Sequence, residues 1–546
     1  MDKEGRTALH YATLNCSKEI FDILLSHNVA VDTKDQNGKT ALHYAVKYNK
    51  ITAADALISH GADINSIDKD GDTTFFTSIR SNNIEMLDFL ISHGANINYI
   101  PEKGTSALIF SLIYHNFDVA MHLISRGSDI TLRDNIRNSA IHYAAAYRYP
   151  EANVGGLRNK RHEEIEKIHE TIRLLITCGL DINTRNDNKQ TAFHIAVKNN
   201  DKSTVEFLIS LGVNVYAKDK HGMNGLCIAV ENNYNDIMKI IISHCIENNS
   251  IRDCDIIPAF RIAIKNKNLE TIQFLIKYVT DINKCNNLGR TALHYAVTSN
   301  STSLVKSFGF HAARQNVVTS EGIEIVKLLI SHGADVNIKD KNGITAFHLS
   351  AQQDRKETTE YIISHGADIN SKDNEGHSIL HYAAENDNKE TIEYLLSLGL
   401  DVNSKDNKGG TPLHIASIND NKEIAELLLL HEANVNAKSS DWSFKKLNMV
   451  EKRWSIVSNT CVSDDNQYCI TPLHCAAKIG SKQLVELFIS NGADINSKDT
   501  ELNTALNYAV ISKNMEIIEF LILHGSDINV ANKDGKTALH DAIEKS

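Results

Sequence analysis

Short apolar and polar segments alternate along the chain in a pattern that predicts pairs of helices. The stretch that begins at Ser378 reads SILHYAAENDNKETIEYLLSLGLDVNSKDNKGG. Its apolar residues in Leu380–Ala384 and in Ile392–Leu396 follow the three-to-four spacing of a helix, and the polar letters NDNK separate the two runs. Gly399 suits the left-handed position that ends a helix, and the polar residues after it favour a turn. The pattern therefore predicts a helical hairpin followed by an outward loop.

The same pattern returns fifteen times, and most copies begin 33 residues apart. The copies begin at Thr7, Thr40, Thr73, Ser106, Ser139, Thr191, Asn224, Pro258, Thr291, Thr345, Ser378, Thr411, Thr471, Thr504 and Thr537. Neither helix of a copy is long enough to be stable alone, so neighbouring copies must cover its apolar face. We therefore expect an all-α repeat solenoid that occupies residues 1–546 as a single domain. The copies at Asn224 and Pro258 lack both the threonine and the histidine of the motif, so we expect that segment to unfold first.

Histidine occupies the fourth position of ten copies, and this regularity argues against a catalytic or metal-binding role. The ten are His10, His43, His142, His194, His294, His348, His381, His414, His474 and His540. A catalytic or metal site needs one cluster of side chains, whereas these residues are spread along the chain. We expect them to satisfy polar groups at buried helix starts. The sequence also carries no nucleotide-binding or esterase motif, so we expect neither enzymatic activity nor a cofactor.

The motif T-[AP]-L-H-x-A at a period of 33, followed by segments such as LLISHGADIN, closely resembles the ankyrin repeat. The resemblance covers nearly the whole chain and implies a curved solenoid whose concave groove binds other proteins. It also implies that the motif histidine hydrogen-bonds near the motif threonine and to the backbone of neighbouring loops. In this family the groove is lined by loop tips and by exposed positions of the first helices. In the most regular stretch these positions are Asn342, Ile344, Asn374, Glu375, His377, Lys408 and Gly410 in the loops, and Gln352, Gln353, Glu385, Asn386 and Asn419 in the helices.

Three insertions interrupt the regular spacing, and function tends to concentrate where a repeat protein departs from its pattern. Residues 147–165 and 300–321 each lie between the two helices of one copy, and the apolar spacing of HEEIEKIHETIRLLI predicts that the first insertion lengthens the second helix. Residues 439–465 lie in an outward loop and hold Trp442, Phe444 and Trp454, which include both tryptophans of the chain. We expect these aromatic residues to contact a partner. The alternative is that they pack against their own repeats.

Composition narrows the classes of function further. Hydrophobic residues make up 42% and charged residues 23% of the chain, as expected for an ordered helical protein. The formal net charge of -11 offers no basic footprint for nucleic acid. The first residues do not read as a signal peptide, and no apolar run is long enough to span a bilayer. Nine scattered cysteines without a C-x-x-C pair indicate neither a disulfide framework nor a zinc site. We therefore expect a cytoplasmic protein, with the nucleus as the alternative.

These observations predict a non-catalytic interaction scaffold that binds one or more proteins through its groove and its loop insertions. We expect a monomer that carries no metal, binds no nucleic acid and does not insert into a membrane. The alternative is a substrate-recruiting or targeting subunit of a catalytic complex. The chain begins within the loop of a copy, which is consistent with a segment upstream of Met1, whereas Asp541 in the last copy suggests a polar cap at the other end.

Overall fold

The computed structural model describes residues 1–15, 18–27, 29–101, 104–147, 158–248, 253–298, 321–353, 355–385, 388–440 and 470–544. Within these residues the regular structure is helical, and the loops contribute four isolated antiparallel bridges. The chain divides into two compact units, Met1–Ala259 and Phe260–Ser546, and the division falls inside helix α15 (Asp253–Lys265). The prediction of an all-α repeat fold is confirmed, whereas the single solenoid over residues 1–546 stays a prediction.

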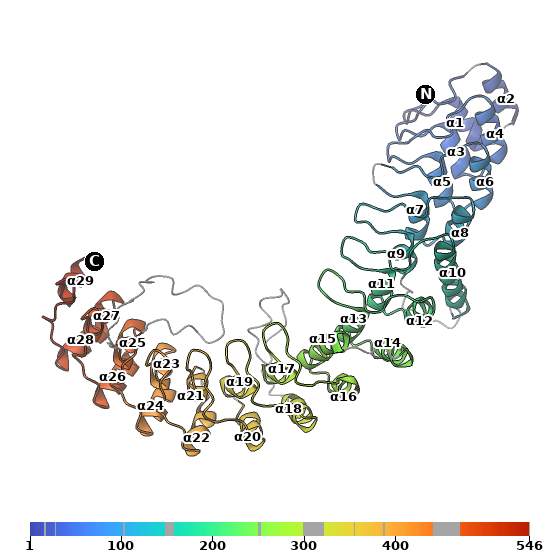
Figure 1. Ribbon diagram of the computed structural model, residues 1–546. Coiled ribbons are helices and arrows are strands. Elements are labelled where there is room, and N and C mark those ends of the chain that lie inside the picture. Colours follow the sequence, from blue (N-terminus) through green and yellow to red (C-terminus); the bar gives the residue numbers. More distant parts are fainter. Residues whose placement is uncertain are drawn as a thin grey trace. The chain divides into compact units, whose positions relative to one another are not determined.

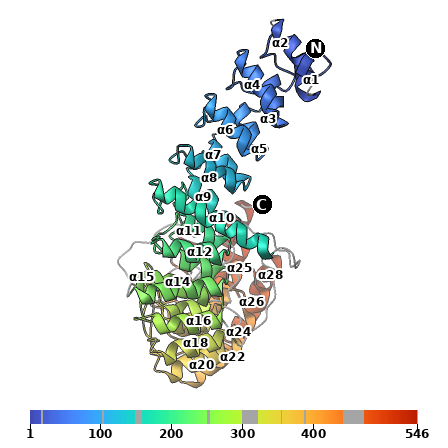
Figure 2. The ribbon, with the colours of Figure 1, turned by 90° about the vertical axis from the view of Figure 1, so that its right-hand side faces the viewer.

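Unit 1 is built from consecutive helix pairs, each followed by a loop (Figure 1). The pairs are α1 (Ala8–Asn15) with α2 (Lys18–Ser26), α3 (Ala41–Lys47) with α4 (Ile51–Ser59), α5 (Thr74–Arg80) with α6 (Ile84–Ser92), α7 (Ala107–Ile113) with α8 (Phe117–Ser125), α9 (Ala140–Ala144) with α10 (Arg158–Thr177), α11 (Ala192–Lys198) with α12 (Lys202–Ser210), and α13 (Gly225–Glu231) with α14 (Asn235–Glu247). Within this unit the first helices step in order beside the second helices, as α1, α3 and α5 do beside α2, α4 and α6 in Figure 2.

Unit 2 repeats the same plan after α15. It contains α16 (Leu269–Leu275) with the 3-10 turn η1 (Ile276–Tyr278), α17 (Ala292–Thr298) with α18 (Glu321–Ser331), α19 (Ala346–Gln352) with α20 (Lys356–Ser364), α21 (Ile379–Ala384) with α22 (Lys389–Ser397), α23 (Pro412–Ile418) with α24 (Lys422–Leu430), α25 (Pro472–Ile479) with α26 (Lys482–Ser490), α27 (Ala505–Ile511) with α28 (Met515–Leu523), and α29 (Ala538–Glu544). The helices therefore begin where the fifteen motif copies predict them, with α15 as the exception described below.

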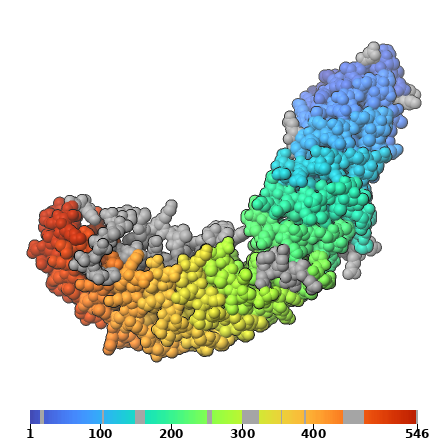
Figure 3. All heavy atoms as spheres, in the orientation of Figure 1, coloured from blue at the N-terminus to red at the C-terminus, as the bar shows by residue number. Residues whose placement is uncertain are grey.

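Small and aliphatic residues of the first helices contribute much of the core of each unit. In α3, Leu42, Ala45 and Val46 are fully buried, because α3 packs against its own partner α4 and against the first helices on either side, α1 and α5. Fully burying one leucine side chain stabilises a fold by about 1.5–3 kcal/mol. Alanine at two of the motif positions lets successive helices approach closely, and within each unit the atoms of consecutive repeats follow one another without a break (Figure 3). The short helices are thus held by stacking.

The loops of neighbouring repeats also lie in close contact. At Gly376 the backbone is in the left-handed region (φ 84°), and a Cβ atom there would lie 2.4 Å from Oδ1 of Asn407 in the next loop. Glycine is therefore required twice, for its conformation and for its lack of a side chain. The loops form a packed layer beside the first helices.

Two helices depart from the regular repeat. Helix α10 extends from Arg158 to Thr177, and its residues Ile168, Ile172 and Leu175 are fully buried, which confirms that the first insertion lengthens a second helix. The repeat pattern predicts a helix start at Pro258, and this prediction is wrong, because α15 begins at Asp253 and carries Pro258 inside it. The rest of the first insertion (148–157) and nearly all of the second (299–320) lie outside the described residues.

Candidate functional site

Each motif histidine closes the first turn of its helix. Nδ1 of His414 accepts the backbone N–H of Thr411 at 3.2 Å and lies 2.9 Å from the Thr411 hydroxyl oxygen. Nε2 lies 3.0 Å from the carbonyl oxygen of Ile470, the residue that precedes the next motif. A backbone N–H can only donate, so Nδ1 must carry a lone pair and Nε2 must carry the hydrogen. His414 is therefore a neutral side chain that joins two repeats.

The same arrangement recurs along the chain. All ten motif histidines accept the backbone N–H of the threonine or serine three residues earlier. Eight of them also place Nε2 within 3.2 Å of a carbonyl oxygen in the loop that leads to the next repeat: His10, His142, His194, His294, His348, His381, His414 and His474. Burial lowers the pKa of His414 to about 4 and that of His381 to about 3. The prediction that these histidines are structural is confirmed, because Nδ1 of all ten, and Nε2 of these eight, bond to the backbone.

A row of asparagines joins the loops on a second line that the sequence interpretation missed. Oδ1 of Asn403 accepts the backbone N–H of Asn434 at 2.7 Å, and its Nδ2 donates to the carbonyl oxygen of Glu432 at 3.2 Å. Asn337 makes the equivalent bonds to the next repeat. The sequence does show this asparagine, because it recurs in the segments DIN and DVN. The sequence interpretation treated it only as a residue that favours turns. Both ends of the amide are used, so each asparagine fixes the spacing of two repeats.

Four of the predicted partner contacts lie together at the tips of neighbouring loops in unit 2. The backbone N–H of Asn374 donates to the carbonyl oxygen of Asn342, and that of Asn407 donates to the carbonyl oxygen of Glu375, both at 2.9 Å. The side chains of Asn342, Asn374 and Glu375 are exposed, and that of Lys408 is half-buried. We name Asn342, Asn374, Glu375 and Lys408 the loop-tip row. Its backbone is held by the neighbouring loops, and Asn374 adds a bond from its Nδ2 to the carbonyl oxygen of Lys341 at 2.9 Å. The side chains of Asn342 and Glu375 face outward.

A second group lies at the C-terminal ends of three successive first helices. Nε2 of Gln352 in α19 donates to a carboxylate oxygen of Glu385, which follows α21, and Nδ2 of Asn419, which follows α23, donates to the Glu385 carbonyl oxygen at 3.1 Å. We name Gln352, Gln353, Glu385 and Asn419 the helix-end row. Gln352 is only 6% exposed, so it positions Glu385 and offers little surface to a partner. Gln353 and Glu385 are half-buried. Asn386 lies outside the described residues.

Ile344 is a core residue, and its inclusion among the predicted partner contacts is corrected by its burial. Its side chain is 3% exposed. Its backbone N–H donates to Oδ1 of Asp340 at 3.0 Å, and its carbonyl oxygen lies 3.0 Å from Nε2 of His294. A residue directly before the motif threonine lies under the loop, where an apolar side chain joins the core. His377 occupies the same position in the next repeat and is also largely covered, with its side chain 12% exposed.

Trp442, Phe444 and Trp454 lie outside the described residues, but the two ends of their insertion are placed. Ser439 and Ile470 form an antiparallel bridge, with the backbone N–H of Ser439 donating to the carbonyl oxygen of Ile470 at 2.8 Å and the reverse bond at 2.9 Å. The third insertion therefore leaves and rejoins the repeat at one point of an outward loop, as predicted.

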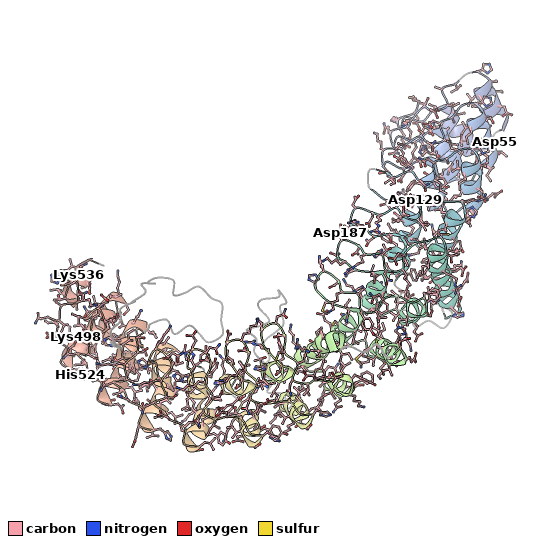
Figure 4. The ribbon with its side chains drawn as sticks, in the orientation of Figure 1. Asp55, Asp129, Asp187, Lys498, His524 and Lys536 are labelled. Carbon is pink, nitrogen blue, oxygen red and sulfur yellow. The ribbon has the colours of Figure 1, made fainter. Side chains whose placement is uncertain are left out.

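Aspartates lie on both sides of the helix pairs of unit 1. In unit 1, Asp187 and Asp129 lie on the side of the loops, whereas Asp55 of α4 lies on the opposite side with the second helices (Figure 4).

Across the described ranges, no three or more histidine, cysteine, aspartate or glutamate side chains gather as a metal-binding group. None of the helices described combines the length and the apolar composition needed to cross a membrane.

Comparison with protein-family models identifies the repeat. Ankyrin repeats (3 copies) match residues 1–68, 61–134, 164–253, 310–406, 374–439 and 473–546, and ankyrin repeats (many copies) match residues 260–307. The matches cover most of the chain, and they pass over residues 135–163 and 440–472, which contain nearly all of the first and third insertions.

Several curated proteins resemble parts of the chain. Ankyrin repeat protein L371 of Acanthamoeba polyphaga mimivirus is 28% identical over 127 residues, which are 21% of this chain and 17% of that protein. Ankyrin repeat protein FPV230 of Fowlpox virus (strain NVSL) is 38% identical over 72 residues, 13% of this chain and 37% of that protein. The chain thus spans well under half the length of these relatives. Among solved structures, the human ASB11 ankyrin repeat domain matches at 18% identity with a TM-score of 0.37, over 49% of this chain and 98% of that domain.

Proposed function

The chain belongs to the ankyrin repeat family, whose repeats serve as protein–protein interaction scaffolds, and we propose that unit 2 binds a protein partner through the loop-tip row and the helix-end row. The main support for this proposal is that some polar side chains bond one repeat to the next, whereas others are exposed to solvent. The motif histidines and the asparagines of the DVN segments, such as Asn403, are committed to joining repeats. Asn342 and Glu375 instead face outward from a loop layer whose backbone is already hydrogen-bonded. Asn374 is also exposed, and its Nδ2 donates to the carbonyl oxygen of Lys341 in the preceding loop at 2.9 Å.

A loop that is ordered before binding loses little conformational entropy when a partner docks. The backbone bonds between neighbouring loop tips support such preorganisation in the loop-tip row. The row offers amide, carboxylate and ammonium groups at regular spacing, which suits polar recognition of an extended or folded protein surface. The proposal therefore assigns affinity to a fixed surface and assigns no catalysis to the chain.

We propose that the third insertion extends the same surface. Ser440, where the insertion leaves the repeat, donates its backbone N–H to the carbonyl oxygen of Lys408 at 2.8 Å. Trp442 and Phe444 follow within four residues and Trp454 follows fourteen residues after Ser440, and tryptophan beside basic residues is typical of interface anchors. We further propose that the protein acts as a monomer in the cytoplasm.

A matched pair of charge reversals tests the proposal. Glu375→Arg changes the loop-tip row, and Glu357→Arg makes the same change at an exposed position of α20 on the side of the second helices. Proteins captured from native lysate by the unchanged chain should remain bound to the Glu357→Arg variant and be lost from the Glu375→Arg variant. Equal loss from both variants, or from neither, would contradict the proposed surface. An enzyme among the captured proteins would favour a targeting subunit over a general scaffold.

A further inference from the structure

His377 lies between two buried carboxylates that belong to neighbouring loops of unit 2. Its Nδ1 lies 3.1 Å from Oδ2 of Asp373 in its own loop, and its Nε2 lies 3.5 Å from Oδ2 of Asp406 in the next loop. Each aspartate side chain is only 4% exposed. An ionised carboxylate can only accept hydrogen bonds, and a neutral imidazole has a single N–H. Only the doubly protonated imidazolium can donate to both aspartates.

The contrast with His381, four residues later, isolates this feature. The two rings are 5.5 Å apart. His381 accepts the backbone N–H of Ser378 at Nδ1, which requires a lone pair there, and its Nε2 faces the carbonyl oxygen of Gly410 at 3.1 Å. The hydrogen-bond partners of His381 therefore select its neutral form. His377 instead faces two carboxylates, Asp373 at hydrogen-bond distance and Asp406 at the distance of an ion pair when the ring is protonated.

The position that His377 occupies carries a permanent cation elsewhere in the chain. Each such residue directly precedes a motif threonine or serine. Nζ of Lys39 lies 3.9 Å from Oδ2 of Asp68 in the next loop, and Nε of Arg290 lies 3.1 Å from Oδ2 of Asp340. These pairs show that a cation at this position can bridge to the aspartate of the following repeat. His377 provides the same bridge with a side chain whose charge depends on pH.

We propose that His377 is a pH-dependent clamp, which in its protonated form holds its own loop to the loop of the next repeat through Asp373 and Asp406. In Figure 1 these are the loops that precede α21 and α23. The inference does not depend on the proposed binding function, although the clamp lies beside Asn374 and Glu375 of the loop-tip row.

The surrounding groups come from three repeats. They are Asp340 and His348 from the preceding repeat, Lys372, Asp373, His381, Tyr382 and Glu385 from the repeat of His377, and Asp406 and Lys408 from the following loop. Burial disfavours the charge on Asp373, yet its bonds to His377 and Tyr382 hold its pKa below the ordinary value. Burial raises the pKa of Asp406. A cation between these two carboxylates therefore offsets a desolvation cost that both of them carry.

The sign of the pH dependence follows from the charge that the clamp needs. The contribution of the clamp is present where His377 is protonated and both aspartates are ionised, and it is lost as the pH rises and the imidazolium gives up its proton. The motif histidines have the opposite effect, because burial lowers their pKa and their neutral forms are the folded ones. The motif histidines change the stability of the whole fold with pH. Exchange measured only in the two loops therefore distinguishes the effect of His377 from theirs.

Amide hydrogen exchange of the full chain, corrected for intrinsic rates, tests the clamp in the loops around Asp373 and Asp406. Protection of these loops in the unchanged chain relative to His377→Gln should be about tenfold near pH 6, as one charged hydrogen bond implies, and should fall as the pH is raised to 8. His377→Lys should keep the protection at both pH values, because lysine stays charged across this range. His365→Gln, at the exposed end of α20, is the control and should change neither loop.

A protection ratio that is the same at both pH values would overturn the clamp, and so would a His377→Lys variant that exchanges as fast as His377→Gln. If His377→Gln does not fold, NMR of the chain labelled at histidine Cε1 decides the question, with the His377 signal assigned by its absence from His377→Lys. A signal with the shift of a neutral ring at pH 6 would then overturn the proposal.

Discussion

The hydroxyl group of Tyr382 donates a hydrogen bond to Oδ2 of Asp373, nine residues earlier, at 2.9 Å. The other oxygen of Asp373 accepts the backbone N–H groups of Glu375 and His377, which shape the turn of the loop. One carboxylate thus joins the loop to the first helix. The same relationship links Asp35 with Tyr44 at 2.8 Å, and Asp134 with Tyr143 at 2.6 Å.

We predict that Tyr382→Phe lowers the free energy of unfolding by about 1–2 kcal/mol, because Asp373 then loses a buried donor while remaining charged. Burial raises the pKa of Tyr382, so the hydroxyl keeps its hydrogen throughout the neutral range. Urea unfolding at pH 7 measures the effect. Tyr361→Phe in α20 removes the same atom from the side of the second helices and serves as the control. Equal losses in the two variants would show that the bond to Asp373 contributes nothing specific.

Two substitutions of His414 distinguish the hydrogen bond that caps its helix from the effect of its lowered pKa on stability. Asn507 stands at the histidine position of its own repeat, where its Oδ1 accepts the backbone N–H of Thr504 at 3.0 Å. His414→Asn should therefore retain the cap. His414→Ala should lose it, with a loss of about 1–3 kcal/mol at pH 7.

The pH dependence of His414→Asn has a defined sign. Burial lowers the folded-state pKa of His414 to about 4, from an ordinary value of 6.5. The unfolded chain therefore binds more protons than the folded chain between these values, and the contribution of His414 to stability is lost as the pH falls through them. Asparagine does not titrate, so the unfolding free energies of the unchanged chain and of His414→Asn should converge between pH 7.5 and pH 5. A gap that stays constant over this range would show that His414 is not neutral in the fold.

Sequence periodicity was sufficient to predict the helix pairs and the role of the motif histidines, because both follow from a pattern that recurs at a fixed spacing. It could not reveal the bond between Tyr382 and Asp373, since the two letters lie on different elements and meet only when the loop folds back on the helix. The burial of Ile344 was missed for a similar reason, because a position described as a loop tip lies beneath the loop. The helix start predicted at Pro258 was wrong, because the helix that contains this proline begins five residues earlier, at Asp253.

The asparagine row should contribute to stability more than exposed asparagines do. Asn403→Ala removes both a bond to the backbone N–H of Asn434 and a bond to the carbonyl oxygen of Glu432. We expect a loss of about 1–3 kcal/mol in unfolding free energy, because two backbone groups of the next repeat lose a partner. Asn342→Ala changes an exposed asparagine in the same unit, and its effect should stay within about 0.5 kcal/mol. Denaturant unfolding of both variants checks the difference, and similar losses would remove the structural role assigned to Asn403.

Helices α15 and α16 should open before the repeats from Thr345 to Leu430. Arg261 stands at the histidine position of this repeat, burial lowers its pKa, and its Nε finds no hydrogen-bond partner. Pro258 also removes one backbone donor from within α15. The preceding repeat is better formed than its sequence suggests, because Oδ1 of Asn224 caps α13 by accepting the backbone N–H of Cys227 at 2.9 Å. Hydrogen exchange should therefore place the weakest point after Asn224. Protection of α15 and α16 equal to that of α19 to α24 would contradict this.

The third insertion should be removable without loss of the fold, because its ends already meet. The bonds between Ser439 and Ile470 match that from the backbone N–H of Asp406 to the carbonyl oxygen of Gly410, which closes a loop with only three residues at its tip. Replacing residues 440–469 with that three-residue tip, Asn-Lys-Gly, restores the 33-residue spacing between Thr411 and Thr471. His414 keeps its acceptor at Ile470, so the unfolding free energy should change by no more than about 0.5 kcal/mol. A larger loss would mean that the insertion packs against its own repeats. If stability is unchanged and the captured partners are lost, Trp442 and Trp454 belong to the binding surface. If the shortened chain captures the same partners as well as before, the binding surface consists of the loop-tip row and the helix-end row alone.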